Sequence, residues 1–182
     1  MPGTASSLVP IALVGFMGAG KTTVGRELAR RMGWPFEDLD ELIERSQGQT
    51  IKEIFERHGE TRFRELEGFV LREALRRPPP FVLALGGGAF IQNDIQNLLR
   101  DNGIPAVFLD APADELYRRG AEDGLVRPLR RDEETFRQLY DERRPAYLRA
   151  ALAIETSTKP VAAVVDEIIC RLNLAPAGGA WD

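Results

Sequence analysis

The feature that most constrains this chain is a glycine-rich octapeptide between an apolar run and a helical pattern. Residues 15–22 read Gly-Phe-Met-Gly-Ala-Gly-Lys-Thr and follow the apolar residues 8–14. A buried strand, a glycine loop ending in Lys-Thr and a helix, in that order, are typical of a phosphate-binding loop. We therefore expect a nucleotide site here in preference to an ordinary glycine turn.

Each part of this loop has a physical role in holding phosphate. The glycines let the backbone curl so that successive N–H groups point inward, and the helix behind the loop adds unpaired donors and its positive dipole end. Lys21 brings a mobile positive charge to the outer phosphates, and Thr22 offers a hydroxyl to Mg²⁺. The residues predicted to bind phosphate are Gly18, Ala19, Gly20, Lys21, Thr22 and Thr23.

The bulk composition limits the class of protein. A length of 182 residues fits one domain, and 43% apolar with 29% charged residues indicates a soluble globular chain. The net charge of −4 provides no basic field for nucleic acid or an anionic membrane. We expect one domain over residues 1–182, with flexible ends at 1–7 and 175–182 and with neither nucleic acid nor membrane as a partner.

Cys170 is the single cysteine, so an intrachain disulfide is impossible. This favours a reducing, cytoplasmic compartment, and residues 8–16 lack the positive flank of a signal peptide. The apolar residues around Cys170 predict a buried packing role for its side chain. The expected form is a cytoplasmic monomer.

Short apolar runs alternate with helical patterns along the chain. This alternation predicts an α/β fold in which helices cover both faces of a parallel sheet. In such sheets ligands bind beyond the carboxyl ends of the strands, where residues 15–22, 38–40 and 86–88 are expected. The predicted strands are 8–14, 35–39, 81–85, 106–109 and 151–155, and the predicted helices are 22–32, 40–47, 51–58, 61–77, 94–102, 113–120, 133–149 and 161–172.

Two carboxylates end the second predicted strand. Asp38 and Asp40 are two residues apart, so in extended chain they project to the same side. Beside a phosphate loop they suit a cation, or a cation together with a substrate hydroxyl. The alternative is a strand end followed by a helix cap at Asp40.

Two further segments carry candidate binding groups. Arg64 lies between apolar Phe63 and Leu66, and the alternative for it is an i,i+3 pair with Glu67 on a solvated helix face. Residues 86–88 are three glycines, which permit a ligand to approach bare backbone. Their alternative is a loop that only turns sharply.

Together these segments closely resemble shikimate kinase over roughly residues 9–172. The resemblance implies a three-layer P-loop kinase fold with a five-stranded parallel sheet flanked by helices and a mobile lid at about 118–132. The motifs that carry it are the phosphate loop, Asp38-x-Asp40, the Ile-x-Glu-Ile-Phe … Gly-Glu-x-x-Phe-Arg-x-x-Glu block ending at Glu67, Gly86-Gly87-Gly88, Arg127-Pro128-Leu129 and Arg143-Arg144-Pro145-Ala146-Tyr147.

The resemblance also implies roles at matching positions on the acceptor side. Asp40 would hold hydroxyls of shikimate, while Arg64 and Arg143 would clamp its carboxylate. The backbone around the glycines would line the same pocket. The implied substrate-binding residues are Asp40, Arg64, Gly86, Gly87, Gly88 and Arg143.

The implied reaction transfers the γ-phosphoryl group of ATP to the 3-hydroxyl of shikimate, a step of the shikimate pathway to aromatic amino acids. Phosphoryl transfer requires in-line positioning and neutralisation of charge on the oxygens. Lys21, Arg127 and Mg²⁺ would neutralise, and Asp40 would orient the attacking hydroxyl and accept its proton or serve chiefly to position it. The implied magnesium ligands are Thr22 and Asp38, the latter through water. ATP, Mg²⁺ and shikimate are thus the expected small molecules.

Residues 118–132 hold five arginines and two glycines. Such a charge run suits a solvated loop, but the match at Arg127 favours a lid that closes over ATP and excludes water. The family usually has an adenine-stacking arginine seven residues before the lid arginine. Here that position is Gly120, so Arg119, one step away, and Lys159 in the later loop 156–160 are the expected adenine contacts.

Two other functions remain open from the residues. One is a kinase for another small hydroxy acid such as gluconate, which shares the phosphate loop but should lack the arginine and triple-glycine set. The other is a non-catalytic regulator that binds ATP, which needs no carboxylate clamp.

Overall fold

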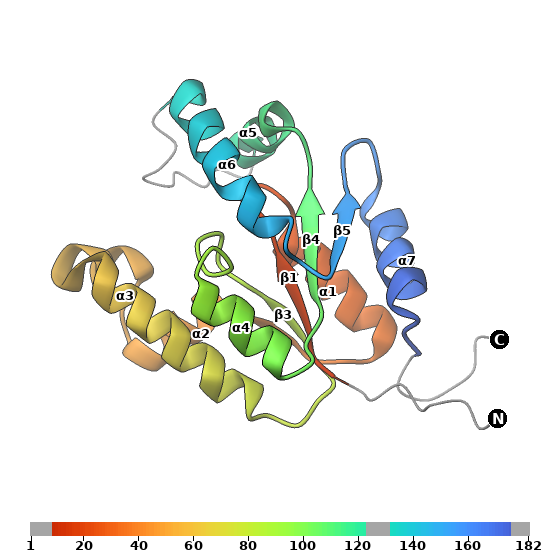
Figure 1. Cartoon of the computed structure of the whole chain (residues 1–182), viewed down its shortest axis with the longest axis horizontal. Helices are drawn as coiled ribbons and strands as arrows, with labels where there is room; N and C mark the ends of the chain where they lie inside the picture. Colours follow the sequence, from red (N-terminus) through yellow and green to blue (C-terminus); the bar gives the residue numbers. More distant parts are fainter. Residues whose placement is uncertain (1–8, 123–131, 176–182) are drawn as a thin grey trace.

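The computed structural model describes residues 9–122 and 132–175. Within them, five parallel strands form one sheet in the order β2-β3-β1-β4-β5 (Figure 1). The strands are β1 (Ile11–Val14), β2 (Phe36–Asp38), β3 (Val82–Ala84), β4 (Ala106–Asp110) and β5 (Leu152–Glu155). The predicted five-stranded parallel sheet is therefore confirmed.

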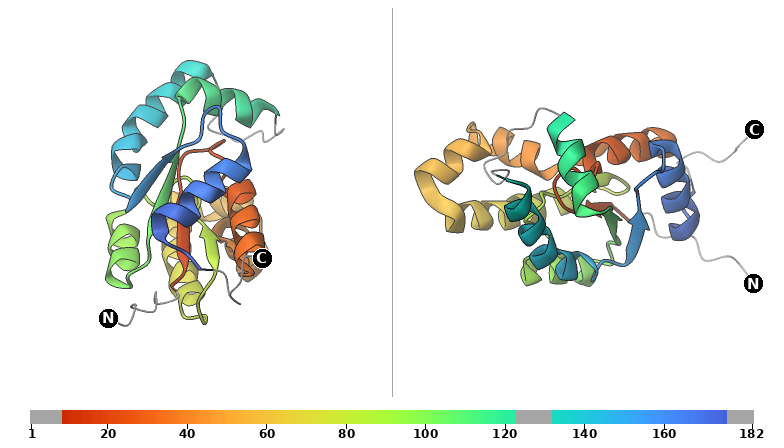
Figure 2. Two further views of the ribbon diagram at one scale, coloured as in Figure 1. Left: turned by 90° about the vertical axis from the view of Figure 1, so that its right-hand side faces the viewer. Right: turned by 90° about the horizontal axis from the view of Figure 1, so that it is seen from above.

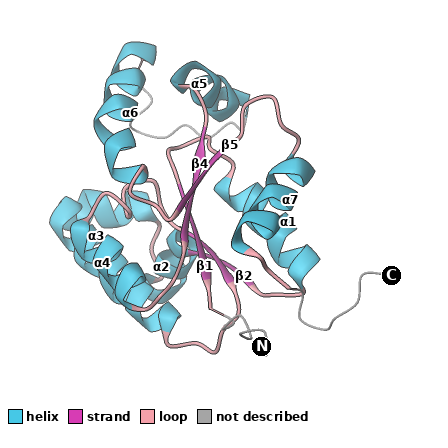
Figure 3. Ribbon diagram, turned by 45° about the vertical axis from the view of Figure 1, so that its right-hand side comes forward, coloured by secondary structure: helices cyan, strands magenta, loops and turns pink. Residues whose placement is uncertain are grey.

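Helices cover both faces of this sheet. Figure 3 shows α1 and α7 together on one face and α3 and α4 on the other, and the side view in Figure 2 agrees that α1 and α7 run next to each other. The helices are α1 (Lys21–Met32), α2 (Leu39–Gln47), α3 (Ile51–Leu75), α4 (Asn93–Asp101), α5 (Ala113–Glu122), α6 (Glu133–Tyr147) and α7 (Val161–Leu172). The three-layer α/β arrangement predicted from the alternating pattern is confirmed.

The helix α3 joins two segments that the sequence predicts as separate helices, 51–58 and 61–77. Gly59 breaks the helical backbone between them, with φ 76° and ψ 175°. That conformation is open to glycine and strained for other residues. The predicted interruption is therefore real, although hydrogen bonding continues across it.

The central strand β1 is buried along its whole length, from Ile11 to Val14. Because helices cover both faces, every residue of this strand meets the core, which explains its unbroken apolar run. Leu13 pairs in register with Ala84 of β3 and Val107 of β4. The sheet thereby holds the ends of β1 and β3 at one edge, where the glycine loops begin.

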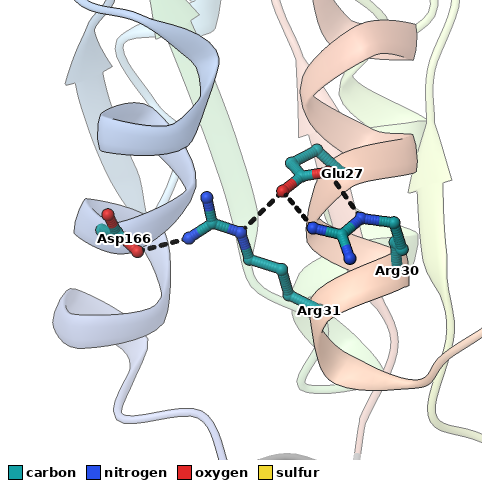
Figure 4. A network of polar contacts seen from close by, with 4 residues as sticks. All are labelled: Glu27, Arg30, Arg31 and Asp166. Atoms are coloured by element: carbon teal, nitrogen blue, oxygen red, sulfur yellow. Dashed lines mark hydrogen bonds and ion pairs between the residues drawn. The ribbon is translucent and has the colours of Figure 1, made fainter.

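A surface network ties α1 to α7 (Figure 4). Glu27 accepts hydrogen bonds from Arg30 and Arg31, and Arg31 also pairs with Asp166 of α7. The hydrogen bonds from Arg30 and then Arg31 lower the pKa of Glu27 to about 2. The network bridges the two helices on the face opposite α3 and α4.

The prediction that Cys170 is buried is wrong, because its side chain is exposed. Helix α7 buries Val164, Val165 and Ile168. Cys170 comes two residues after Ile168, which turns it by about 200° to the other side of the helix. None of the helices among residues 9–122 and 132–175 has the length and apolar composition that a membrane crossing requires.

Candidate active site

The phosphate loop lies between the end of β1 and the start of α1, as the sequence predicts. Gly18 has φ +80°, and a Cβ added to it would lie 2.5 Å from the carbonyl oxygen of Leu116 in α5. Both the left-handed backbone and this close approach require glycine at position 18. The loop therefore passes tightly against α5, which lies with α6 beyond the arrowhead of β4 in Figure 1.

Lys21 and Thr22 stand in the first turn of α1 behind this loop. The Lys21 ammonium donates to the carbonyl oxygens of Gly15 and Phe16, at 2.9 and 3.0 Å. The Thr22 hydroxyl donates to Oδ2 of Asp38 at 3.0 Å. The structure thus brings the loop cation and the two predicted magnesium ligands to one edge of the sheet.

Asp38, and not Asp40, caps α2. Its Oδ1 accepts the backbone N–H of Asp40 at 3.0 Å. Asp40 belongs to the first turn of the helix, so the expectation that both side chains project from extended chain is wrong. The helix begins one residue earlier than predicted because Asp38 supplies a cap of the kind that helix starts favour. Asp40 is thereby released from a capping role.

The Asp40 carboxylate lies against the triple-glycine loop. A Cβ added to Gly86 would lie 2.6 Å from Oδ1 of Asp40 and 3.3 Å from Oε1 of Glu67. Only a bare Cα leaves room for two carboxylates so close to the loop. The glycine loop after β3 thus lies directly beside the carboxylates of Asp40 and Glu67.

Arg64 does form the i,i+3 pair with Glu67, but the pair is not on a solvated face. Arg64 Nη1 donates to Oε2 of Glu67 at 2.8 Å, and Nη2 donates to Glu60 at 3.2 Å. The Glu67 side chain is only 1% exposed. Burial raises the pKa of Glu67, while the hydrogen bond from Arg64 opposes that shift. The pair therefore fixes a guanidinium at the edge of the site.

Gly88 lies against the Nη1–Nη2 end of this guanidinium. A Cβ on Gly88 would lie 2.5–2.9 Å from three atoms of the Arg64 guanidinium, whereas one on Gly87 would make only ordinary contacts from 3.7 Å. Arg64 is thereby pressed between a glycine and a buried carboxylate. Gly86 and Gly88 thus admit the side chains of Asp40 and Arg64 close to the loop backbone, and the approach of a ligand to that backbone stays a prediction.

Gly88→Ala should weaken acceptor binding without unfolding the protein. The new methyl group displaces the flexible end of Arg64, so we expect acceptor KM to rise about tenfold while the melting temperature changes little. Gly68→Ala is the matched control, because Gly68 lies on α3 outside the predicted binding residues and a Cβ there would make one ordinary contact, at 3.4 Å from Arg72. It should leave acceptor KM near its wild-type value. Steady-state kinetics of both variants make the comparison, and equal KM values in the two would contradict it.

Arg143 comes from α6 and faces the phosphate loop. Its guanidinium carbon lies 5.9 Å from the ring centroid of Phe16, a buried residue of that loop. The Phe16 ring also meets Phe136 and Tyr140 edge-on. One face of α6 therefore packs on the loop and carries with it the arginine that is predicted to bind the acceptor.

One turn further along α6, Tyr147 fastens the triple-glycine loop. Its hydroxyl donates to the carbonyl oxygen of Gly87, and its side chain is fully buried. Burial raises the pKa of Tyr147 to about 12, although the nearby Arg143 and Arg64 charges act the other way. The hydroxyl thus stays protonated and holds the glycine loop against α6.

Both expected adenine residues are at the loop after β5: Arg119 reaches it from α5, and Lys159 belongs to it. Arg119 donates to the side-chain and carbonyl oxygens of Thr156, at 3.2 and 3.0 Å. Lys159, in the same loop, pairs with Glu167 of α7 at 2.7 Å. The structure brings these residues to one place without assigning a ligand to them.

Most of the predicted lid, with Arg127, lies outside the described residues, as do the predicted end at 1–7 and all but the first residue of the predicted end at 175–182. Within the described chain, sequence reasoning gave no role to Phe16, Gln92 or Tyr147, and it offered Glu67 only as the partner of Arg64 on a solvated helix face. The signal for Glu67 was its i,i+3 spacing from Arg64, and for Tyr147 its i,i+4 spacing from Arg143. Gln92 left no signal, because its partner is 25 residues away in the sequence.

The fold and the site together define a small-molecule kinase of the P-loop class. The shikimate kinase family model matches residues 17–173 of the chain. A shikimate kinase of Rhodopseudomonas palustris is 41% identical over 167 residues, which cover 90% of this chain and 81% of that protein. The chain belongs to the shikimate kinase family. It is therefore an ATP-dependent phosphotransferase that uses an alcohol group as acceptor.

Solved structures agree with this assignment. Shikimate kinase from Acinetobacter baumannii, in complex with shikimate, has a TM-score of 0.84 and 39% identity, over 92% of this chain and 94% of that one. A gluconokinase from Sinorhizobium meliloti has a TM-score of 0.65 at 21% identity, over 91% and 92% of the chains. The second likeness shows the shared fold alone and does not favour gluconate as the acceptor.

Proposed function

We propose that this chain transfers the γ-phosphoryl group of ATP to the 3-hydroxyl of shikimate, giving shikimate 3-phosphate and ADP. The observation that carries the proposal is the convergence of Asp40, Arg64, Arg143 and the triple-glycine loop beside a phosphate loop. A small ligand that carries a carboxylate and ring hydroxyls needs positively charged donors for its carboxylate and, beside them, a carboxylate acceptor for its hydroxyls. This edge of the sheet offers both.

On the nucleotide side, the loop backbone and the start of α1 hold the phosphates. The glycine N–H groups face inward around the anion, and the helix dipole adds a favourable field. Lys21 would exchange its loop carbonyl partners for phosphate oxygens. The proposed phosphate-binding residues are Gly18, Ala19, Gly20, Lys21, Thr22, Thr23 and Arg127.

On the acceptor side, Arg64 and Arg143 grip the carboxylate of shikimate. A guanidinium offers a planar pair of donors that matches a carboxylate, which a lysine cannot do. Asp40 accepts from the ring hydroxyls. The backbone of residues 86–88 lines the pocket and sets how closely the ring approaches.

The pair Thr22 and Asp38 fits a magnesium site. Hydroxyl and carboxylate oxygens are the ligand types that Mg²⁺ prefers, and the two side chains are 3.0 Å apart. We propose that Thr22 binds the ion directly and Asp38 through water. When bound, the ion supplies positive charge to the phosphate oxygens.

In the transfer step, a bond forms between the 3-hydroxyl oxygen and the γ-phosphorus while the bond to the β–γ bridging oxygen breaks. Lys21 and Arg127 neutralise charge on the transferred group and on the leaving ADP. Asp40 orients the hydroxyl and takes its proton. Because the transition state is loose, the proton need not leave early, and positioning by Asp40 matters most.

The remaining proposed nucleotide contacts are those of the lid and of the adenine. We propose that residues 118–132 act as a lid, with Arg127 reaching the phosphates and the acceptor, because a closed lid excludes water from the transfer. Arg119 and Lys159 are proposed at the adenine. Their common position at the loop after β5 supports this choice.

A coupled assay of ADP release tests the function directly. The purified chain is offered ATP with shikimate, quinate, gluconate or no acceptor. We expect turnover with shikimate well above the other three arms. Equal rates in every arm would indicate an ATP-binding regulator with background hydrolysis, and preference for gluconate would indicate a different hydroxy-acid kinase.

We also propose a single kinase domain that works as a cytoplasmic monomer, without nucleic-acid or membrane partners. The single cysteine supports the reducing compartment, and the negative net charge supports the absence of nucleic-acid and membrane partners. Light scattering of the purified chain, with and without ATP, checks the monomer.

A further inference from the structure

Gln92 occupies a position where its residue type is unexpected. It is the N-cap residue of α4, with φ −76° and ψ 124°, yet its side chain makes no capping hydrogen bond. Serine, threonine, asparagine and aspartate are preferred at such positions because their side chains satisfy an open N–H of the first turn. Gln92 leaves that helix end to other partners and directs its amide elsewhere.

The amide reaches across to the buried carboxylate of α3. Gln92 Nε2 donates to Oε2 of Glu67 at 2.6 Å, and more weakly to the Ala89 carbonyl at 3.5 Å. The same Oε2 accepts Arg64 Nη1 at 2.8 Å. One carboxylate oxygen is therefore held from two elements at once, by its own helix and by the start of α4.

The hydrogen bond from Gln92 to Glu67 restricts a movement of the Arg64 side chain that packing alone would allow. A hollow of about 670 Å³ between α3 and α4 is lined in part by Arg64 and Gln92. The Arg64 side chain is 23% exposed, so it has room to swing toward this hollow. Its guanidinium is held by Glu67, by Glu60 at 3.2 Å and over the ring of Phe63, and of the two carboxylates only that of Glu67 is buried.

We propose that Gln92 is a positioning residue of the acceptor site, which locks the Glu67 carboxylate so that Arg64 presents its guanidinium to the acceptor's carboxylate. The inference rests on the proposed function of Arg64. Gln92 acts only through Glu67 and touches no reacting atom. A purely structural role would instead be served as well by a residue that caps α4.

The charges around Glu67 give the proposal a pH signature. Three groups face Glu67: Arg64 on its own helix, Gln92 at the start of α4 and Asp40 of α2. Arg64 also faces Glu60, and its charge interacts with the hydroxyl of Tyr147 of α6. Burial raises the pKa of Glu67, and the bonds from Arg64 and Gln92 oppose the rise. Loss of the Gln92 bond should raise this pKa further, so the acid limb of kcat/KM for shikimate should move to higher pH.

The test compares Gln92→Met with Gln96→Met. Methionine keeps the length of the side chain and removes its donor. Gln92→Met should raise shikimate KM about tenfold, with kcat and ATP KM within about twofold of wild type, and should shift the acid limb upward. Gln96, one turn along α4, donates to the Phe90 carbonyl at 2.6 Å, and its substitution should leave shikimate KM unchanged.

Gln92→Ser separates positioning from helix stability. Serine can cap α4 but cannot reach Glu67, so the melting temperature should hold or rise while shikimate KM rises as in Gln92→Met. Unchanged shikimate KM and pH profile in folded Gln92→Ser would overturn the proposal. In a Glu67→Ala background, Gln92→Met should add no further change in KM, and a full independent effect there would also overturn it.

The wild-type chain separates failure of this inference from failure of the proposed function. Turnover of shikimate by the wild type, with unaltered KM in the Gln92 variants, rejects the positioning role alone. A wild type that does not turn over shikimate rejects the function on which the role depends.

Discussion

Alanine in place of Lys21 is expected to lower kcat by about a thousandfold or more, because the transition state then loses a positive charge beside the transferred phosphoryl group. The ammonium lies over the loop, bonded to the carbonyl oxygens of Gly15 and Phe16. Its stem stands at the start of α1 and outside the apolar core. We therefore expect the melting temperature to stay close to that of the wild type.

Lys52→Ala is the matched control for this loss. Lys52 lies on α3, is 74% exposed and approaches Glu56 at 3.8 Å, a surface pair of small energetic weight. Its removal should leave kcat at the wild-type value. Initial rates of ADP release at saturating shikimate measure both variants, and near-normal kcat in a folded Lys21→Ala protein would mean that residues 15–22 do not bind phosphate for catalysis.

The sequence predicts the frame of this molecule well because its signals are local. An apolar run covered on both faces needs no partner to be recognised as a buried strand, and β1 is such a run. Gly15 and Gly20, followed directly by Lys21 and Thr22, identify the loop by spacing alone. The family resemblance then orders the remaining motifs along the chain, and the sheet and its flanking helices follow that order.

The details that depend on tertiary contacts could not be predicted in this way. The i,i+3 spacing of Arg64 and Glu67 is the same on an exposed and on a buried helix face, and only the tertiary fold brings Gly86 and Gln92 against the Glu67 carboxylate. The choice of Asp38 over Asp40 as helix cap depends on where β2 ends. Gln92 sits 25 residues from Glu67, and no local rule links the two.

Helix α6 shows how one element joins both halves of the site. Phe136 and Tyr140 pack on Phe16 of the phosphate loop, and Tyr147 holds the Gly87 carbonyl. Arg143 lies between these anchors on the same helix. Its position is thus fixed relative to the nucleotide loop and to the glycine loop together, as alignment of donor and acceptor requires.

Removing this arginine should therefore damage acceptor binding far more than nucleotide binding. Arg143→Ala leaves the carboxylate of shikimate with one guanidinium partner in place of two, which costs about 2–5 kcal/mol of binding free energy when the ion pair is shielded from water. Such a loss raises shikimate KM by about thirtyfold or more. The contact with the Phe16 ring is worth only about 0.5–1 kcal/mol, so ATP KM should change by less than about sixfold.

Arg143→Lys and Arg149→Ala make the interpretation specific. The lysine variant keeps a cation near Phe16 but lacks the planar pair of donors, so ATP KM should return toward wild type while shikimate KM stays raised. Arg149, an exposed residue beyond α6 that donates to Asn93 at 3.2 Å, should be replaceable without effect on either KM. Steady-state kinetics of all three variants with each substrate varied in turn make the comparison. An Arg143→Ala enzyme with wild-type shikimate KM would show that Arg143 does not bind the carboxylate. An equal rise in both KM values would show that its role is to hold the phosphate loop.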